Sequence, residues 1–253
     1  MNVRAMATIY RFEMLRFFRT LTQSFLSPVL SASLYFIVFG AAIGPRMTEL
    51  GTVGYAEFLV PGIIMLSVMT QSISNAAFSI FYPKFIRTTY ELLSAPISFL
   101  EILGGYVGAA ATKSFLVALV ILTTSTMFVD LQIIYPLAML LMLILTCLCF
   151  ALFGFIIGIW ADNFEQLQII PLMIVTPMVF LGGSFYSISV LPPLWQTVTL
   201  FNPVVYLISG FRWTFYGQAD VPLISSVLAF VLFSAACLAV IWWIFRTGWK
   251  LRS

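Results

Sequence analysis

The sequence has 253 residues, of which 62% are apolar and only 8% are charged. Ordinary soluble domains are about 45–50% apolar and about 25% charged, so this composition indicates a protein of the lipid bilayer. The net charge is only +3, and the basic residues form no dense run beside aromatic residues, which excludes a nucleic-acid-binding surface. Histidine is absent, and Cys147, Cys149 and Cys237 stand in apolar runs without metal-binding or redox spacing.

The first 25 residues carry a helical pattern that is too polar for a membrane span. One face of this helix is apolar, and its members are Val3, Met6, Tyr10, Met14, Phe17 and Leu21. The basic residues of the segment are Arg4, Arg11, Arg16 and Arg19. The pattern predicts an amphipathic interfacial helix over residues 1–25 at the membrane surface. The alternative is a cytoplasmic helix that packs on another protein.

Six apolar runs of about 20 residues are long enough to cross a bilayer. They cover residues 26–44, 58–81, 99–129, 134–160, 167–182 and 222–245. Basic residues collect on cytoplasmic flanks, so their positions predict the orientation. With both termini inside, nine basic residues are cytoplasmic, whereas Arg46 and Arg212 lie outside and Lys113 lies within a helix. The sequence therefore predicts an all-α, multi-pass membrane protein with cytoplasmic N and C termini.

A short cytoplasmic helix is predicted over residues 83–95, between the second and third spans. Pro83 suits a first helical turn, and Pro96 disfavours helix at the residue before it. Arg87 and Glu91 are four residues apart, a spacing that places both on one helical face as an i,i+4 pair. The partly apolar surface favours docking into another protein, and the alternative is a helix that lies on the lipid surface. The candidate docking residues are Arg87, Tyr90, Glu91, Leu92, Leu93 and Pro96.

The third span begins as a separate helix, because Ser98 and Glu101 form an S-x-x-E capping box. Lys113 lies within this span, where an ionisable side chain is costly and usually faces the bundle interior or a wet cavity. It is a candidate pathway residue for an anionic substrate group. The alternative is a side chain that reaches toward the cytosol or toward a partner such as Glu101, although Glu101 lies twelve residues away, too far for direct contact. Glycines at GxxxG spacing indicate close helix packing within the chain, and the alternative is a seam between two copies. These pairs are Gly40 and Gly44, Gly104 and Gly108, and Gly154 and Gly158.

The fifth span runs into GGSFYSISVLPPLW, residues 182–195, where two glycines and two prolines interrupt the apolar pattern. Residues 185–216 then stay aromatic and aliphatic, unlike an exposed loop. Irregular backbone is tolerated at membrane depth only where it is buried in protein or lines a cavity. The sequence therefore predicts an outer re-entrant hairpin over residues 183–217; the alternative is an aromatic belt that lies flat at the interface.

Two short helices are expected in this hairpin, one before Pro192 and Pro193 and one from Asn202-Pro203 to Gly217. Glycine supplies the sharp reversal, and proline opens each new segment. The predicted outer gate residues are Gly182, Gly183, Phe185, Tyr186, Pro192, Pro193, Asn202, Pro203 and Arg212.

Four segments together resemble the ABC-2 type transporter permeases, in the branch encoded apart from its ATPase, which includes YadH-like permeases and nodulation-factor exporters. They are FLVPG at 58–62, ELLSAPIS at 91–98, GGSFYS with LPPLW at 182–195, and FNPVVYLISGFR at 201–212. Each motif alone is weak, but their order and spacing are specific, and the resemblance covers nearly the whole chain. The first of the GGSFYS residues, Gly182, and the last, Ser187, depart from the common S-G-x-F-Y-P form, which leaves the architecture intact.

The resemblance implies a single ABC-2 transmembrane domain over residues 1–253, in the cell inner membrane, that serves as the permease of an exporter. Two copies, or one copy with a related partner, would stand on two cytoplasmic ATPase subunits. The helix over residues 83–95 would be the coupling helix, and the helix over residues 1–25 the connecting helix. The substrate would be hydrophobic or amphipathic: a drug, a lipid or a lipid-linked saccharide.

The chain itself is not expected to be an enzyme. A phosphate-binding loop needs G-x-x-x-x-G-K-[ST], and the nearest segment, residues 111–114, lacks both glycines. No cofactor is expected in this chain, and ATP and Mg²⁺ are expected on the partner ATPase. A secondary transporter would show paired broken helices and mid-membrane carboxylates, and neither is found. A non-transporting membrane scaffold is the other alternative, but it has no need for a re-entrant outer element.

Overall fold

The computed structural model describes residues 3–43, 53–88 and 96–250, and within these ranges every regular element is a helix. Six helical segments of the described ranges are long and apolar enough to cross a membrane, which confirms the predicted number of spans. The elements are α1 (Val3–Arg19), α2 (Leu21–Tyr35), η1 (Phe36–Ile43), α3 (Tyr55–Phe85), α5 (Phe99–Ser125), α6 (Pro136–Trp160), α7 (Phe164–Ile170), η3 (Pro171–Val175), α8 (Thr176–Leu181), η4 (Ile188–Val190), α9 (Pro193–Leu200), α10 (Pro203–Tyr216) and α11 (Leu223–Thr247).

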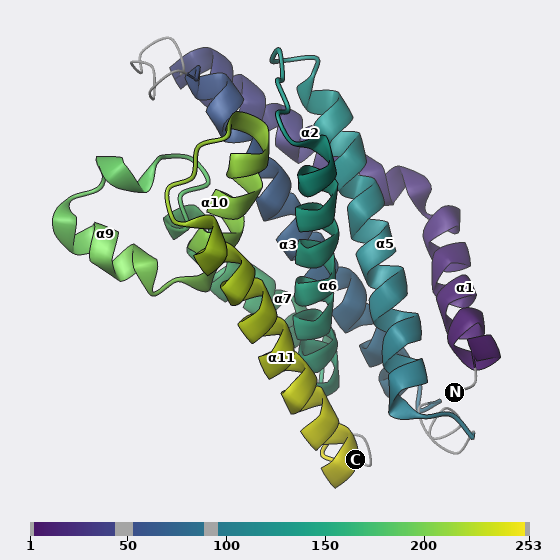
Figure 1. Cartoon of the computed structure of the whole chain (residues 1–253). Coiled ribbons are helices and arrows are strands. Elements are labelled where there is room, and N and C mark those ends of the chain that lie inside the picture. The colour runs from purple at the N-terminus through teal and green to yellow at the C-terminus, as the bar shows by residue number, and fades with distance from the viewer. Residues whose placement is uncertain (1–2, 44–52, 89–95, 251–253) are drawn as a thin grey trace.

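The long helices form one bundle in which α3 packs against both α6 and α5 (Figure 1). Both described ends of the chain lie at the same end of this bundle, here called the basal end, with the end of α3 and the start of α5. The opposite, apical end holds the start of α3 and the start of α6. Backbone hydrogen bonds from Ile134 and Tyr135 to the carbonyl oxygens of Phe215 and Thr214 join α10 to this apical end.

Close packing of α3 on α6 depends on two glycines of α6. A Cβ atom on Gly154 would overlap the backbone of Ile73, and one on Gly158 would overlap the backbone of Ala77. Small residues let two membrane helices bring their backbones together, so dispersion contacts accumulate along the seam. The predicted intramolecular role of this GxxxG pair is therefore confirmed.

The capping box at the start of α5 is also confirmed, because the Ser98 N–H donates to Glu101 Oε2 over 2.9 Å. The expectation for Pro83 is wrong: this residue lies inside the last turn of α3 instead of opening a new helix. The helix ends two residues later, at Phe85, in a Schellman motif. There the Thr88 N–H donates to the Pro83 oxygen, and Arg87 adopts a left-handed φ of 62°. A proline near a helix end removes one N–H donor without breaking the preceding turns.

Two other boundaries differ from the expected ones. The N-terminal helix α1 ends at Arg19, and a turn at Thr20 separates it from the first span, which begins at Leu21. The expected helix before Pro192 and Pro193 is wrong, because only the single 3₁₀ turn η4 precedes them and the helix α9 follows. Proline has a fixed φ and no N–H, both of which suit the first residue of a helix.

Candidate functional site

Helix α1 packs along the basal half of α5 through its predicted apolar face. Met6 contacts α5 at Gly104, and the Tyr10 hydroxyl donates to Thr112 Oγ1 over 3.0 Å. One turn further, Met14 is buried in a small apolar cluster with α5. The amphipathic face of the sequence is thus the face that contacts the bundle, and the position of α1 at the membrane surface stays a prediction.

The four basic residues of α1 differ in their surroundings. Arg4, Arg11 and Arg19 are exposed, whereas Arg16 turns toward α3. The Arg16 Nη2 atom donates to Glu13 Oε2 over 2.8 Å, and the guanidinium carbon lies 5.0 Å from the ring centre of Phe78. Arg16 therefore connects α1 to α3, while its side chain stays 30% exposed.

A buried ionic cluster joins α1, α3 and α5. Lys113 Nζ donates to Glu13 Oε2 over 2.7 Å, and Ser79 Oγ donates to the same oxygen over 2.8 Å. The side chains of Lys113 and Glu13 are only 3% and 1% exposed. Buried charges are tolerated when they are paired and hydrogen-bonded, so Lys113 has the acidic partner that its place in a span requires. Two cations, Lys113 and Arg16, share one carboxylate, which leaves the cluster with a net positive charge.

A polar cavity of about 460 Å³ lies beside this cluster. Its charged and amide groups come from four different helices: Arg16 of α1, Asn75 of α3, Lys113 of α5 and Gln168 of α7. The Asn75 side-chain amide also donates to Ser114 Oγ over 3.4 Å, which holds it at the cavity wall. Lys113 thus lies at the wall of a cavity, while its side chain is paired with Glu13, and its role in a transport pathway stays a prediction.

The cavity continues into a polar stripe on α3. Most of this helix is buried, but one face stays accessible, and its residues are Ser67, Thr70, Gln71, Ser74, Asn75, Phe78 and Tyr82. Spacings of three and four place these side chains on one side of the helix. The stripe is hydroxyl- and amide-bearing through the middle of the span, where lipid contact would leave polar groups without partners.

A second ionic cluster lies at the apical end around Arg212, one of the predicted gate residues. Its Nη1 atom donates to Asp220 Oδ2 over 2.7 Å, and its Nη2 atom donates to the Gly183 oxygen over 2.6 Å. The guanidinium carbon also lies 3.8 Å from the ring centre of Phe58. The side chain is buried, and burial lowers the Arg212 pKa from its ordinary value. One cation and one carboxylate balance, so this cluster carries no net charge.

The FLVPG and GGSFYS segments, which lie far apart in the sequence, meet at this cluster. A Cβ atom on Gly62 would overlap the Ser184 backbone, so only glycine permits the loop to lie directly on α3. The Tyr55 hydroxyl donates to the Phe185 oxygen over 3.2 Å. Gly183 has a φ of 80°, a conformation that side chains other than glycine rarely adopt.

The remaining predicted gate residues divide into two groups. The Asn202 amide donates to the Met178 oxygen over 2.6 Å, and Pro203 starts the largely buried helix α10. In contrast, Pro192 and Pro193 are exposed, and α9 projects from the bundle (Figure 1). Gly182 is buried, and Tyr186 is half-buried beside the loop. Within the aromatic and aliphatic segment 185–216, helix α10 is thus largely buried in the protein, whereas helix α9 is exposed.

Two of the predicted docking residues, Arg87 and Pro96, are described, and both lie at the basal end. Arg87 and Pro96 are exposed on either side of residues 89–95, and Tyr90, Glu91, Leu92 and Leu93 lie outside the described residues. Nearby, Lys84 Nζ donates to the Ile159 and Ala161 oxygens over 2.8 and 2.9 Å, which ties the end of α3 to the end of α6.

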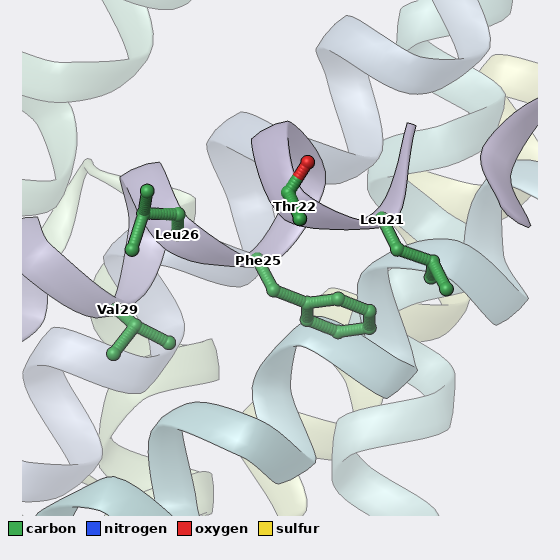
Figure 2. A pocket seen from close by; sticks show the side chains of 5 residues that line it. All are labelled: Leu21, Thr22, Phe25, Leu26 and Val29. Carbon is green, nitrogen blue, oxygen red and sulfur yellow. The ribbon is translucent and has the colours of Figure 1, made fainter. Parts of the chain in front are cut away.

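A further hollow of about 410 Å³ lies on α2, and Figure 2 shows that its lining comes from this one helix. The lining residues are Leu21, Thr22, Phe25, Leu26 and Val29. The ring of Phe25 packs with the buried α1 residues Met14 and Phe17. The hollow carries no ionisable side chain, so it suits contact with lipid or another helix and has no chemistry of its own.

Glu13, Ser79 and Asp220 complete the two clusters, and none was a predicted site residue. A signal for Glu13 was present, because it lies between Tyr10 and Phe17 on the otherwise apolar face of α1. An acid on an apolar face and a lysine in a span are each costly alone, so they are natural partners. Asp220 gave no such signal, because it follows α10 in a polar loop.

Comparisons with known proteins identify the family of the chain. The family model of the ABC-2 type transporter matches residues 4–216. The chain is 39% identical to the inner membrane transport permease YadH of Escherichia coli, over 98% of this chain and 97% of that protein. It is also 26% identical to nodulation protein J of Rhizobium leguminosarum bv. viciae, over 83% of this chain and 82% of that protein. The six apolar helices and these matches together place the chain in the ABC-2 type transporter family, as a multi-pass permease of the inner membrane.

Proposed function

We propose that this chain is the permease subunit of an ABC exporter that moves a hydrophobic or amphipathic molecule outward. A drug, a lipid or a lipid-linked saccharide fits this description. A separate ATPase subunit, present in two copies, binds ATP and Mg²⁺ and supplies the work, and this chain hydrolyses no nucleotide. Both termini of the permease face the cytoplasm.

The accessible polar stripe on α3 is the observation that carries the proposal. Hydroxyl and amide groups such as Ser67, Gln71 and Ser74 stay accessible at mid-span, on the helix that is otherwise the most buried. In a bilayer such groups need water, a polar substrate group or another protein surface. A transport path along this stripe satisfies them.

A second copy of the chain supplies the opposite wall of this path. Helix α2 contacts α3 and presents an apolar stripe with Leu26, Leu30 and Leu34, each more than half exposed. The short helix η3 also contacts α3, and its residues Leu172 and Met173 are both 69% exposed. Apolar surfaces that flank a polar stripe suit a homodimer whose seam encloses the path.

Force enters at the basal end through the segment between α3 and α5. The Schellman motif at Arg87 and the capping box at Ser98 hold both ends of this segment on rigid helices. A displacement of the segment by the ATPase is therefore transmitted directly to α3, which carries the polar stripe. At the apical end, the loop at Gly183 and helix α10 act as the outer gate.

Co-purification with an ABC ATPase and nucleotide-stimulated hydrolysis test this proposal. Leu92→Glu places a charge in the predicted docking helix, and Leu194→Glu places the same charge on α9, where Leu194 is 73% exposed. We expect Leu92→Glu to reduce ATPase association about tenfold or more, because it would bury a charge in the docking contact. Leu194→Glu should retain association. Equal association of both variants would overturn the proposed coupling.

A further inference from the structure

The hollows around Arg16 have the chemistry of a binding site for an anionic amphiphile. The polar cavity is lined by Arg16, Lys113, Asn75 and Gln168, and the first two are cations that share a single carboxylate. The carboxylate is occupied by these cations and by Ser79. A ligand with a negative charge would balance the remaining positive charge at the cavity wall.

A second hollow of about 430 Å³ adjoins the polar cavity, and the two share Arg16 and Phe78. Its other lining residues are Phe12, Leu15, Arg19 and Tyr82. Phe12 is 65% exposed and Leu15 is 49% exposed, which is costly in water and favourable against an acyl chain. A charged, amide-lined cavity and an aromatic, aliphatic hollow thus meet at one arginine.

We infer that these two hollows bind the phosphate-bearing head of an amphiphile, with Arg16 as the main charged contact. Asn75, Ser74 and Gln168 offer hydrogen bonds to the head, and Phe12, Leu15 and Tyr82 line the start of the apolar chain. Arginine suits this task because its planar guanidinium presents paired donors to phosphate oxygens. Binding at the two hollows does not depend on the proposed function. Only the next step rests on it, in which the bound amphiphile moves along the polar stripe of α3.

Equilibrium binding to the purified full-length chain in a neutral maltoside detergent tests the inference. Dodecyl phosphate is the probe, inorganic phosphate tests a free-anion site, and an uncharged dodecyl detergent tests a purely apolar site. We expect saturable binding of dodecyl phosphate that weakens as salt is added, because salt screens the charge attraction. Inorganic phosphate should bind much more weakly, because it lacks the apolar chain. Equal binding of inorganic phosphate or of the uncharged detergent, or no binding of dodecyl phosphate, would overturn the inference.

Arg16→Gln removes the charge that faces the cavity and leaves the Glu13 to Lys113 pair in place. It should weaken dodecyl phosphate binding about tenfold or more, since a charge-assisted hydrogen bond is lost. Arg246→Gln removes a charge from α11, where the guanidinium lies over Trp242 and outside both hollows, and should leave binding unchanged. Equal effects of the two variants would count against the site.

Gln168→Leu provides a variant outside the ionic cluster and should weaken binding about threefold through the loss of one neutral hydrogen bond. Size-exclusion profiles establish that each variant is folded. If Arg16→Gln aggregates, Gln168→Leu becomes the test, and unchanged dodecyl phosphate binding by this variant overturns the inference. The assay contains neither ATPase nor nucleotide. Failure to bind dodecyl phosphate would therefore overturn the binding site but not the proposed function. Binding of dodecyl phosphate by a chain that associates with no ATPase would overturn the proposed function but not the binding site.

Discussion

The apical and basal ionic clusters both stabilise buried cations, but they differ in net charge and in access to a cavity. At the apical end, Arg212 is surrounded by one carboxylate, one carbonyl oxygen and one aromatic ring, and its charge is balanced. At the basal end, Glu13 is shared by Lys113 and Arg16, and a cavity lies beside them. A closed, neutral cluster holds a loop in place, whereas an open cluster with a positive charge left over can take a ligand.

The largest effect on stability is expected at the apical cluster. Arg212→Gln removes the cation and leaves Asp220 and the Gly183 oxygen without their main partner, which should cost about 3–5 kcal/mol. The apparent melting temperature in detergent and the amount of protein in the membrane measure this loss. Arg246→Gln is the control, because its exposed cation–π contact should contribute little. Similar melting temperatures for the two variants would show that the apical cluster does not hold the loop.

The basal cluster should respond to a double-mutant cycle. Glu13→Gln alone leaves two cations near each other in a buried site, and Lys113→Met alone removes one of them. The double variant should be more stable than the sum of the single effects predicts, with a coupling energy of about 1–3 kcal/mol. Additive effects would contradict the direct pairing of Lys113 with Glu13.

An effect smaller than that of Arg212→Gln is expected where the loop meets α3. Gly62→Ala places a methyl group against the Ser184 backbone and should destabilise the protein by about 1–3 kcal/mol. Gly54→Ala is the matched control, since a Cβ there lies 3.8 Å from its nearest neighbour, the Glu57 side chain. If both alanine variants melt at the same temperature, the close approach of the loop is wrong.

The smallest effect concerns Asp162, which lies between two spans at the basal end. A hydrogen bond from Lys250 and the charges of Lys250 and Lys84 lower the Asp162 pKa from its ordinary value. Because the folded pKa is the lower one, the stabilisation is present above the unfolded pKa of about 3.9 and is lost as the pH falls through the folded value. Asp162→Asn should therefore melt slightly earlier than wild type at pH 7. A difference that grows as the solution becomes acidic would contradict this sign.

The sequence predicts what local patterns control and misses what distant residues create together. Six apolar runs and the box at Ser98 and Glu101 depend on short-range rules, and the structure follows them. The meeting of Gly62 with Ser184, and of Glu13 with Lys113, joins residues about 100 or more positions apart, and no local rule specifies such a pair. The sequence identified Lys113 as a costly residue but could not say which helix would compensate it.

The helix boundaries at the prolines were placed wrongly for the same reason: contacts between distant residues decide them. Both Pro83 and Pro193 were expected to mark helix boundaries, and the residue type alone does not say on which side the helix lies. At Pro83 the packing of α3 continues the helix through the proline, whereas at Pro193 the preceding loop is fixed on α3 and α10. Tertiary contacts therefore decide between two boundaries that local chemistry allows equally.

Cross-linking from the two ends of the bundle tests whether the ATPase binds at the basal end. The native cysteines Cys147, Cys149 and Cys237 are buried, so a single exposed cysteine can carry a photoreactive cross-linker. With an ABC ATPase co-expressed, Pro96→Cys at the basal end should cross-link to the ATPase in the presence of nucleotide, and Pro192→Cys at the apical end should not. Cross-linking from Pro192→Cys, or none from Pro96→Cys, would show that the ATPase does not bind at the basal end.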